Sequence, residues 1–346
     1  MADAPAILEL EGLETRFGGE RRFLRAPTPP VRAVDGVSFA VQPGEILGIV
    51  GESGCGKSTL GRTILGTQQE ARGTIRLDGR MVSGVPPHEA RRIRRDVQYV
   101  YQDAAAALDP WWRIGRSLEE ALVINGSEPR AERMSRIDRV LTAVGLDPSV
   151  GRRYPHELSG GQLRRVTLAR VLVLEPRIVI LDEPTSGLDL SVQATVLRLL
   201  RDLQGRLGLT YLFISHDLSV VREMCDRVAI MYLGRIVEMA DTPRIFEAPA
   251  HPYTRVLLQA APRLVAGQGL DRSLDTTMIQ GEPPSPTAVP SGCAFRTRCP
   301  HAVSRCVDEG PRLEAVPAGG SVACHRWGEL AEGAVARAGG ATAPAR

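Results

Sequence analysis

The stretch GESGCGKST, residues 51 to 59, places the strongest constraint on how this chain can fold. It follows the apolar run ILGIV, which has the length of a strand, and a helical period begins at Lys57. Between a strand and a helix, such a loop lets backbone N–H groups close around phosphate oxygens. Lys57 can reach the β- and γ-phosphates and Ser58 can ligate Mg²⁺. The predicted loop consists of Gly51, Glu52, Ser53, Gly54, Cys55, Gly56, Lys57, Ser58 and Thr59.

Hydrophobic periodicity around this loop predicts an α/β protein. Residues 7 to 50 are rich in strand patterns, and residues 110 to 175 carry apolar residues at three- and four-residue spacing. RIVILDEP and TYLFISHD are short apolar runs of strand length, separated by the amphipathic segment SVQATVLRLLRDLQGRLG. This alternation favours a parallel sheet with crossover helices.

Length and composition limit the remaining possibilities. The 346 residues suggest one main unit of roughly 250 residues and an appended piece. The chain is 43% apolar with a net charge of +3, which excludes wholesale disorder and gives little support for nucleic-acid binding. The opening MADAPAILEL lacks the pattern of a signal peptide, and no apolar run has the length of a membrane helix. We therefore expect a cytoplasmic protein without structural disulfides.

Four further polar residues follow apolar strands or lie in loops. Asp182 suits Mg²⁺ coordination, and Glu183 suits polarising a water that attacks the γ-phosphate. His216, in ISHD, could contact the γ-phosphate because a neutral imidazole offers both a donor and an acceptor. Gln102, in VYQD, could ligate Mg²⁺ or hold a water. Taken alone, these positions equally fit a solvated turn, a surface histidine and an ordinary loop glutamine.

The segment LSGGQLRR, residues 158 to 165, raises a separate question. A serine followed by two glycines at the start of an amphipathic helix can bind an anion, or can simply cap the helix. The chain already has a phosphate-binding loop about a hundred residues earlier. A second anion-binding turn therefore needs a phosphate of its own.

Together, the motifs GESGCGKST, YQD, LSGGQ, ILDEPTSGLD and ISHD resemble, in this order, the nucleotide-binding subunits of ABC transporters. Wider features, including DLSVQATVLRLLRDLQ and HPYTRVLL, are similar to the ATPase subunits of dipeptide and oligopeptide importers. The likeness covers about residues 7 to 325. It implies a P-loop NTPase core with an antiparallel β subdomain and a helical signature subdomain, plus a small C-terminal extension that contains cysteines.

The resemblance also supplies the missing phosphate. In that family two ATPase domains pack head to tail, so Ser159, Gly160, Gly161 and Gln162 would face the γ-phosphate held by the other subunit. It further implies that Glu183 is the general base, His216 the switch residue and Gln102 the link to the membrane subunit. Asp189 would bridge the two ATPases. Phe17 is expected either to stack on adenine or to be a core aromatic at a strand end.

One departure lies beside Gln102, where importers of this type usually read close to QDPxxSLNP. This chain has QDAAAALDP, residues 102 to 110. The change leaves the expected function intact but bears on the coupling to the membrane subunit, which this loop faces in the family.

Four cysteines outside the ATPase motifs form a group with 5, 6 and 17 residues between successive members: Cys293, Cys299, Cys306 and Cys324. The spacing differs from the CxxC pairs of common zinc modules. Four thiolates can hold a [4Fe–4S] cluster, and the equivalent segment of some peptide-importer ATPases resembles a cluster site. Zinc and unliganded thiols remain the alternatives.

The resulting prediction is an ATPase that uses ATP and Mg²⁺ to drive import of di- and oligopeptides from the cytoplasmic face of the membrane. Its expected partners are a second, different ATPase subunit, two transmembrane permease subunits and, indirectly, an extracytoplasmic binding protein. Alternatives are an importer ATPase for nickel or another small solute, and a soluble ABC ATPase acting on DNA or ribosomes; Glu183 disfavours a regulator without turnover. We expect an ATPase domain over 7–240 with a helical subdomain at about 103–170, an extension over 241–328 and a disordered tail over 329–346.

Overall fold

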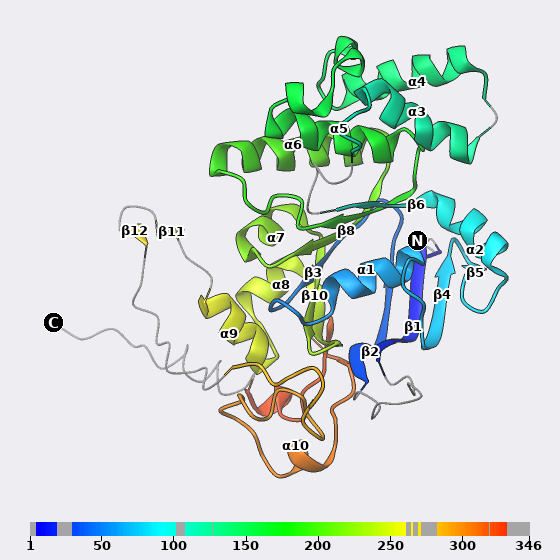
Figure 1. Cartoon of the computed structure of the whole chain (residues 1–346). Helices are drawn as coiled ribbons and strands as arrows, with labels where there is room; N and C mark the ends of the chain where they lie inside the picture. The colour runs from blue at the N-terminus through cyan, green and yellow to red at the C-terminus, as the bar shows by residue number, and fades with distance from the viewer. Residues whose placement is uncertain are drawn as a thin grey trace, which may run out of the picture. The chain divides into compact units, whose positions relative to one another are not determined.

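The computed structural model describes residues 5–18, 30–101, 108–126, 128–260, 264–265, 269–270, 282–317 and 319–330 (Figure 1). Gln102 and the tail beyond residue 330 therefore lie outside the described residues. The chain divides into two compact units. The first is built from the described parts of Met1–Leu13, Ser38–Leu47 and Ser58–Ser215, and the second from those of Glu14–Val37, Gly48–Lys57 and His216–Arg346.

A four-stranded sheet forms at the N-terminal end of the chain, in the order β2-β1-β4-β5. Buried and more exposed residues mix along β1, as expected for a sheet with one face against a core. In the antiparallel pair β4 and β5, Arg76 lies opposite Met81. The bounds are β1 Leu8–Phe17, β2 Val31–Val41, β4 Arg72–Leu77 and β5 Arg80–Met81.

The parallel strands predicted from the apolar runs are confirmed in the first unit. β7 lies between β6 and β8, and Ile180 is opposite Tyr99 on one side and Leu212 on the other. Every residue of β7 and β8 is buried, which explains why these strands read as continuous apolar runs. Their crossover is the amphipathic helix α6 (Leu190–Leu207). The strands are β6 Val97–Val100, β7 Ile178–Asp182 and β8 Thr210–Ser215.

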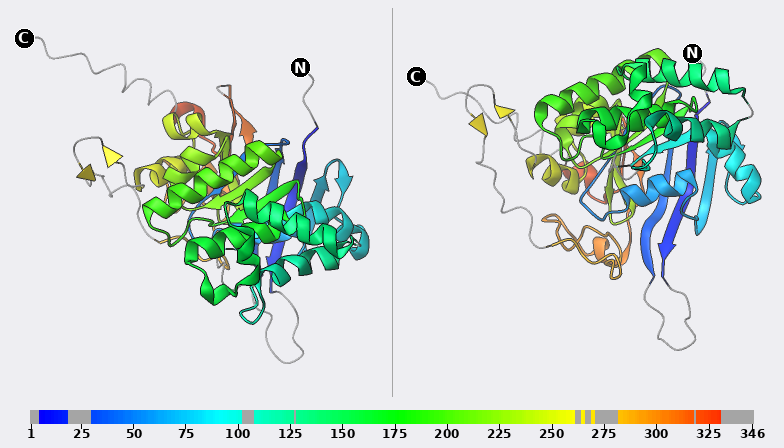
Figure 2. Two further views of the ribbon diagram at one scale, coloured as in Figure 1. Left: turned by 90° about the horizontal axis from the view of Figure 1, so that it is seen from above. Right: turned by 45° about the horizontal axis from the view of Figure 1, so that its top comes forward.

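Three helices of the first unit pack against one another in the region predicted to be helical. They are α3 (Ile114–Asn125), α4 (Arg130–Ala143) and α5 (Gly160–Leu172), drawn in green and cyan-green in Figure 1. They stay side by side in both views of Figure 2. Short 3₁₀ turns, η2 (Pro148–Arg152) and η3 (Pro155–Glu157), lead into α5. The other helices of this unit are α1 Lys57–Leu65 and α2 Pro87–Ile93, with the 3₁₀ turn η1 Arg94–Asp96.

The second unit contains an antiparallel group of strands in the order β13-β14-β10-β9. Glu238 of β10 lies opposite Val322 of β14 and Ile230 of β9, so the C-terminal extension adds strands to a sheet that begins before it. These strands are β9 Arg227–Tyr232, β10 Arg235–Asp241, β13 Glu314–Ala315 and β14 Ser321–Val322. The helices are α7 Leu218–Met224, α8 Thr242–Glu247, α9 Pro252–Ala260 and α10 Arg305–Asp308.

The chain also contains a short ribbon of two strands. β11 (Leu264–Val265) and β12 (Gly269–Leu270) pair with each other as an antiparallel ribbon. None of the described helices combines the length and hydrophobicity that a membrane crossing requires.

Candidate functional site

The phosphate-binding loop has the predicted setting between a buried strand and a helix. It follows β3 (Ile46–Val50), and α1 begins at Lys57. Two of its glycines are required by close backbone approach. A Cβ on Gly51 would lie 2.1 Å from the carbonyl oxygen of Met231, and one on Gly56 would lie 1.9 Å from that of Ala33. The loop therefore has no room for side chains at these two positions.

Lys57 is buried, and its ammonium group folds back over the loop. Its Nζ donates to the carbonyl oxygens of Gly51 at 2.7 Å and Glu52 at 3.0 Å. Burial raises the pKa of the neighbouring Cys55 thiol, while the charge on Lys57 acts in the opposite direction. The one strong cation of the loop thus lies at the end of the loop's own backbone, where an anion would meet it.

Ser58 and Asp182 meet although they are far apart in sequence. Ser58 Oγ donates to Asp182 Oδ1 at 3.1 Å, and Tyr99 donates to the other carboxylate oxygen at 2.6 Å. The three residues line a pocket of about 790 Å³ in the first unit. A hydroxyl and a carboxylate oxygen side by side are the kind of hard oxygen ligands that Mg²⁺ prefers, so this pair fits the metal predicted from the sequence. Burial raises the pKa of Tyr99, and the bond to Asp182 acts in the same direction.

Glu183 follows β7 with an unusual backbone. Its φ is 52°, a left-handed conformation that residues other than glycine rarely adopt, and its N–H donates to the carbonyl of Ile214 at 2.9 Å. Its side chain is half-buried. His216 comes directly after β8 and is exposed, and Asp217 beside it caps α7 through Ser219 and Val220. Both polar residues thus occupy the strand ends at which the sequence predicted them.

The loop Ser159–Gln162, called the signature loop below, forms a reciprocal helix cap. Ser159 Oγ accepts from the N–H of Gln162 at 3.3 Å, and Gln162 Oε1 accepts from the N–H of Ser159 at 3.0 Å. Ser159 and Gly160 are exposed, and a Cβ on Gly160 or Gly161 would meet nothing within 4 Å. Ser159 and Gln162 therefore cap the helix from within the chain, while the space outside the two glycines stays open.

Arg164, two residues beyond this loop, makes contacts that the sequence did not reveal. Its guanidinium donates to the carbonyl of Ser186 at 2.7 Å and to that of Pro184. It thereby joins the helix of the signature loop to the segment after Glu183. The only available signal is its place in LSGGQLRR, which says nothing about its partner.

Asp189 caps α6, accepting from the N–H groups of Ser191 at 3.1 Å and Val192 at 3.0 Å. The bond from Val192 is the largest cause of its lowered pKa. Leu190 beside it is 81% exposed. Phe17 lies at the end of β1 and is 41% exposed, so it is not a core residue. Gln102 falls outside the described residues.

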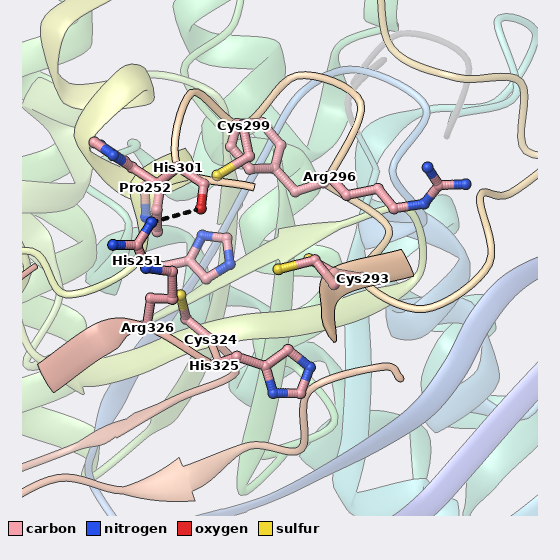
Figure 3. Close-up of a pocket in the computed structure, with 11 residues that line it drawn as sticks. His251, Pro252, Cys293, Arg296, Cys299, His301, Cys324, His325 and Arg326 are labelled. Atoms are coloured by element: carbon pink, nitrogen blue, oxygen red, sulfur yellow. Dashed lines mark hydrogen bonds between the residues drawn. The ribbon is translucent and has the colours of Figure 1, made fainter. Parts of the chain in front are cut away.

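The four C-terminal cysteines line one small pocket of the second unit, with a volume of about 20 Å³. All six cysteines of the chain are free thiols. In Figure 3 the thiols of Cys293, Cys299 and Cys324 point into a common space beside the ring of His251. Cys293 and Cys306 are also joined through the backbone, N–H to carbonyl at 2.8 Å.

Three of these thiols share a local arrangement. Burial raises the pKa values of Cys293, Cys299 and Cys324, the last to about 11, and the neighbouring cysteines raise them further. The backbone near Phe295, His301 and Arg326 acts in the opposite direction and lowers these pKa values. Within the described residues, no set of three or more His, Cys, Asp and Glu side chains is arranged to hold a single metal ion.

Family models identify two regions of the chain. The model of the ABC transporter family matches residues 34–186, which include the phosphate-binding loop, Asp182 and the signature loop. The model described as "Oligopeptide/dipeptide transporter, C-terminal region" matches residues 237–306, which include three of the four C-terminal cysteines.

Curated relatives match over nearly the whole chain. A putative peptide import ATP-binding protein of Brucella ovis is 47% identical over 94% of this chain and 99% of its own length. The di/tripeptide transport ATP-binding protein DppF of Pseudomonas aeruginosa is 45% identical over 85% and 90%, respectively. The oligopeptide transport ATP-binding protein AppF of Bacillus subtilis is 41% identical over 94% and 99%.

Solved structures agree with this assignment. CbiO1 of Clostridium perfringens, part of the ABC transporter complex CbiONQ, has a TM-score of 0.61 at 28% identity, covering 71% of this chain and 92% of its own. The ATP-binding cassette MJ0796, solved as a dimer after hydrolysis with ADP and phosphate, has a TM-score of 0.59 at 26% identity, covering 68% and 98%. This chain therefore belongs to the ATP-hydrolysing subunits of the ABC transporter family, in the branch that carries the oligopeptide/dipeptide transporter C-terminal region.

Proposed function

We propose that this chain couples binding and hydrolysis of MgATP to the uptake of di- and oligopeptides through a membrane permease. The observation that carries the proposal is the contact of Ser58 with Asp182 next to the loop that ends in Lys57. Ser58 and Asp182 provide oxygen ligands for Mg²⁺, and Lys57, the neighbour of Ser58 in the chain, provides a cation for the phosphates. The peptide cargo is inferred from relatives that are named as peptide transport ATP-binding proteins.

In the proposed chemistry, Lys57 exchanges its bonds to the carbonyls of Gly51 and Glu52 for bonds to the β- and γ-phosphates. Ser58 and Asp182 would hold Mg²⁺, which neutralises charge on the phosphates. Glu183 accepts a proton from the attacking water, and its fixed backbone supports that role. His216 would orient the γ-phosphate and Gln102 would join the metal to the permease.

The complete site is proposed to need two chains. The signature loop offers a hydroxyl, N–H groups and the positive end of α5, and no atom blocks the space outside Gly160. The γ-phosphate bound there would belong to a second ATPase subunit, with Asp189 at the contact and Phe17 stacking on adenine. The dimer reported for MJ0796 is consistent with such an assembly. We expect the second subunit to be a different chain.

A permease is the proposed membrane partner. Large apolar side chains are exposed on the first unit: Trp111 is 86%, Ile124 73% and Tyr101 42% exposed. Tyr101 and Ile124 line the same pocket, and a contiguous exposed apolar patch commonly marks an interaction surface. Docking there would hold the chain at the cytoplasmic face of the membrane, with an extracytoplasmic binding protein acting only indirectly and no role for nucleic acid.

We further infer that the four-cysteine pocket holds a [4Fe–4S] cluster, with zinc as the alternative. Four thiols line a single pocket, and four thiolates are the ligand set of a [4Fe–4S] cluster. Arg296, Arg326 and His325 line the same pocket and can offset the negative charge of thiolates. The ligands of a cluster are separated by the cluster itself, so they need not form the tight group that a single ion requires. The cluster's role would be structural or sensory, because ATP hydrolysis needs no electron transfer.

Affinity purification of the chain from membranes tests the transport assignment. We expect a permease pair and a second ATPase to copurify, and peptide with its binding protein to stimulate ATP hydrolysis in proteoliposomes. Stimulation by nickel and not by peptide would overturn the assignment of peptide as the cargo, and the absence of any membrane subunit would overturn the transport role.

Iron and sulfide analysis of anaerobically purified protein tests the cluster: about four irons per chain are expected. Zinc alone, or four alkylatable thiols without metal, would contradict it.

A further inference from the structure

Glu52, inside the phosphate-binding loop, is paired with a residue from the far end of the chain. Arg298 Nη1 donates to Glu52 Oε2 and Nη2 to Glu52 Oε1, both at 2.9 Å. Both residues belong to the second unit. Two parallel bonds between a guanidinium and a carboxylate fix orientation as well as distance, which a single contact does not.

The surroundings of this ion pair enclose it. The Arg298 side chain is only 5% exposed, and that of Glu52 is 25% exposed. The guanidinium lies 5.9 Å from the ring centre of Tyr232 and 6.0 Å from that of Phe295. The bonds to Glu52 are the largest cause of the raised pKa of Arg298. An ion pair in such a place cannot exchange readily with water, so removing one member leaves the other poorly compensated.

The backbone of Glu52 is held from the same side. Its N–H donates to Tyr253 Oη at 3.0 Å, and its carbonyl accepts from Lys57 Nζ at 3.0 Å. Glu52 thus connects the residue that is expected to bind phosphate with the C-terminal part of the chain. Any shift of Arg298 or Tyr253 moves the carbonyl from which Lys57 must be released.

Two routes lead from Glu52 to the four-cysteine pocket. Arg298 stands directly before Cys299, and Phe295, which packs against Arg298, lines the pocket. The second route runs through Tyr253, whose N–H donates to His251 Nδ1 at 3.0 Å. The His251 ring also lines the pocket, together with Cys324.

We propose that Arg298 is a positioning residue for the phosphate-binding loop, and that the four-cysteine segment sets the affinity of this loop for nucleotide through the Arg298–Glu52 pair. A filled, ordered cysteine pocket holds Arg298 in place and keeps the loop preorganised for ATP. Loss of its occupant loosens the segment and weakens nucleotide binding. The dependence on an occupant rests on the cluster proposed above, whereas the role of Arg298 does not.

Kinetics of Arg298→Gln in the assembled transporter test the positioning role. Glutamine removes the charge and the two-bonded geometry, so KM for ATP should rise about tenfold while kcat changes much less. Arg298→Lys, with its charge but no planar fork, should restore part of the affinity. Glu52→Gln combined with Arg298→Gln should cost no more than the worse single variant, because both remove the same contact.

Arg305→Gln is the matched control, since Arg305 lies in the same segment and, among the described residues, its side chain forms only an exposed pair with Glu309. It should leave KM unchanged. The positioning role would be overturned if Arg298→Gln left the KM for ATP unchanged, whether or not kcat fell. If Arg298→Gln does not fold, as judged by its thermal unfolding, the same criteria apply to Arg298→Lys.

Cys299→Ser, with iron and KM measured on the same preparation, tests the link to the pocket. We expect iron to be lost, KM to rise, and no further rise when Arg298→Gln is added. Loss of iron with an unchanged KM would overturn the link while leaving the cluster intact. Conversely, the wild-type chain could contain no iron while Arg298→Gln still raises KM. That result would overturn the cluster and the dependence on an occupant, but it would support the positioning role.

Discussion

The phosphate-binding loop and the signature loop are both glycine-rich turns at the start of a helix, yet they are completed in different ways. Around Gly51 the chain's own backbone leaves no room, and the cation of the loop is satisfied by the loop's carbonyls. Around Gly160 the space is open, and Ser159 and Gln162 cap each other within the loop. The phosphate-binding loop is thus closely packed by its own chain, whereas the signature loop leaves an open surface that a partner can contact.

The largest effect should come from Glu183→Gln, which leaves both loops unchanged and removes only the basic carboxylate. A general base typically contributes about 10²- to 10⁴-fold, so turnover should fall by this order while ATP still binds. An ATP-bound closed dimer should accumulate, measurable by gel filtration with ATP. Near-normal hydrolysis in the assembled transporter would remove Glu183 from the role of base.

Lys57→Ala tests whether the phosphate-binding loop binds phosphate at all. Hydrogen bonds to charged groups contribute about 1.5–3 kcal/mol each, so ATP affinity should fall by roughly 10- to 150-fold. Calorimetric titration of the isolated chain with nucleotide would measure this loss. Unchanged affinity together with unchanged turnover would contradict the assignment of the loop.

Alanine at Gly51 and at Gly160 separates the two loops directly by their packing. Gly51→Ala forces a methyl group against the carbonyl of Met231 and should destabilise the chain by about 1–3 kcal/mol. Gly160→Ala meets nothing within 4 Å and should be neutral or stabilise α5 by up to about 1 kcal/mol. Urea unfolding of both variants provides the comparison. If the two variants lost equal free energy of unfolding, the two loops would not differ in how closely the chain packs around their glycines.

Gly160→Asp in one subunit should lower total activity only about twofold, since a carboxylate would repel the γ-phosphate of only one of two sites. Vanadate trapping of labelled nucleotide can show which chain retains it. The trapped nucleotide should disappear from the partner's phosphate-binding loop, while nucleotide binding to the isolated variant stays normal. Loss of trapping at the variant's own loop would contradict a two-chain site.

Local patterns predicted the elements that carry the site. The sequence indicated that a helix begins at Lys57, that a strand ends at Asp182 and that a helix begins at the signature loop, and these predictions are confirmed. They succeed because strand and helix periods, caps and glycine turns act over a few residues. The contacts of Tyr99 with Asp182 and of Arg164 with Ser186 had no such signal, since ordinary tyrosines and arginines look the same in sequence.

The sequence by itself therefore determined the chemistry of this protein: which residues can meet a phosphate, a magnesium ion and a water, and at the end of which strand or helix each one lies. Only the tertiary structure decided which distant residues support them. Ser58 meets Asp182 across 124 positions of sequence, and Glu52 meets Arg298 across 246. Such pairs form because packing inside each unit brings distant stretches of backbone together, and the free energy of packing belongs to the whole core of that unit rather than to any short stretch.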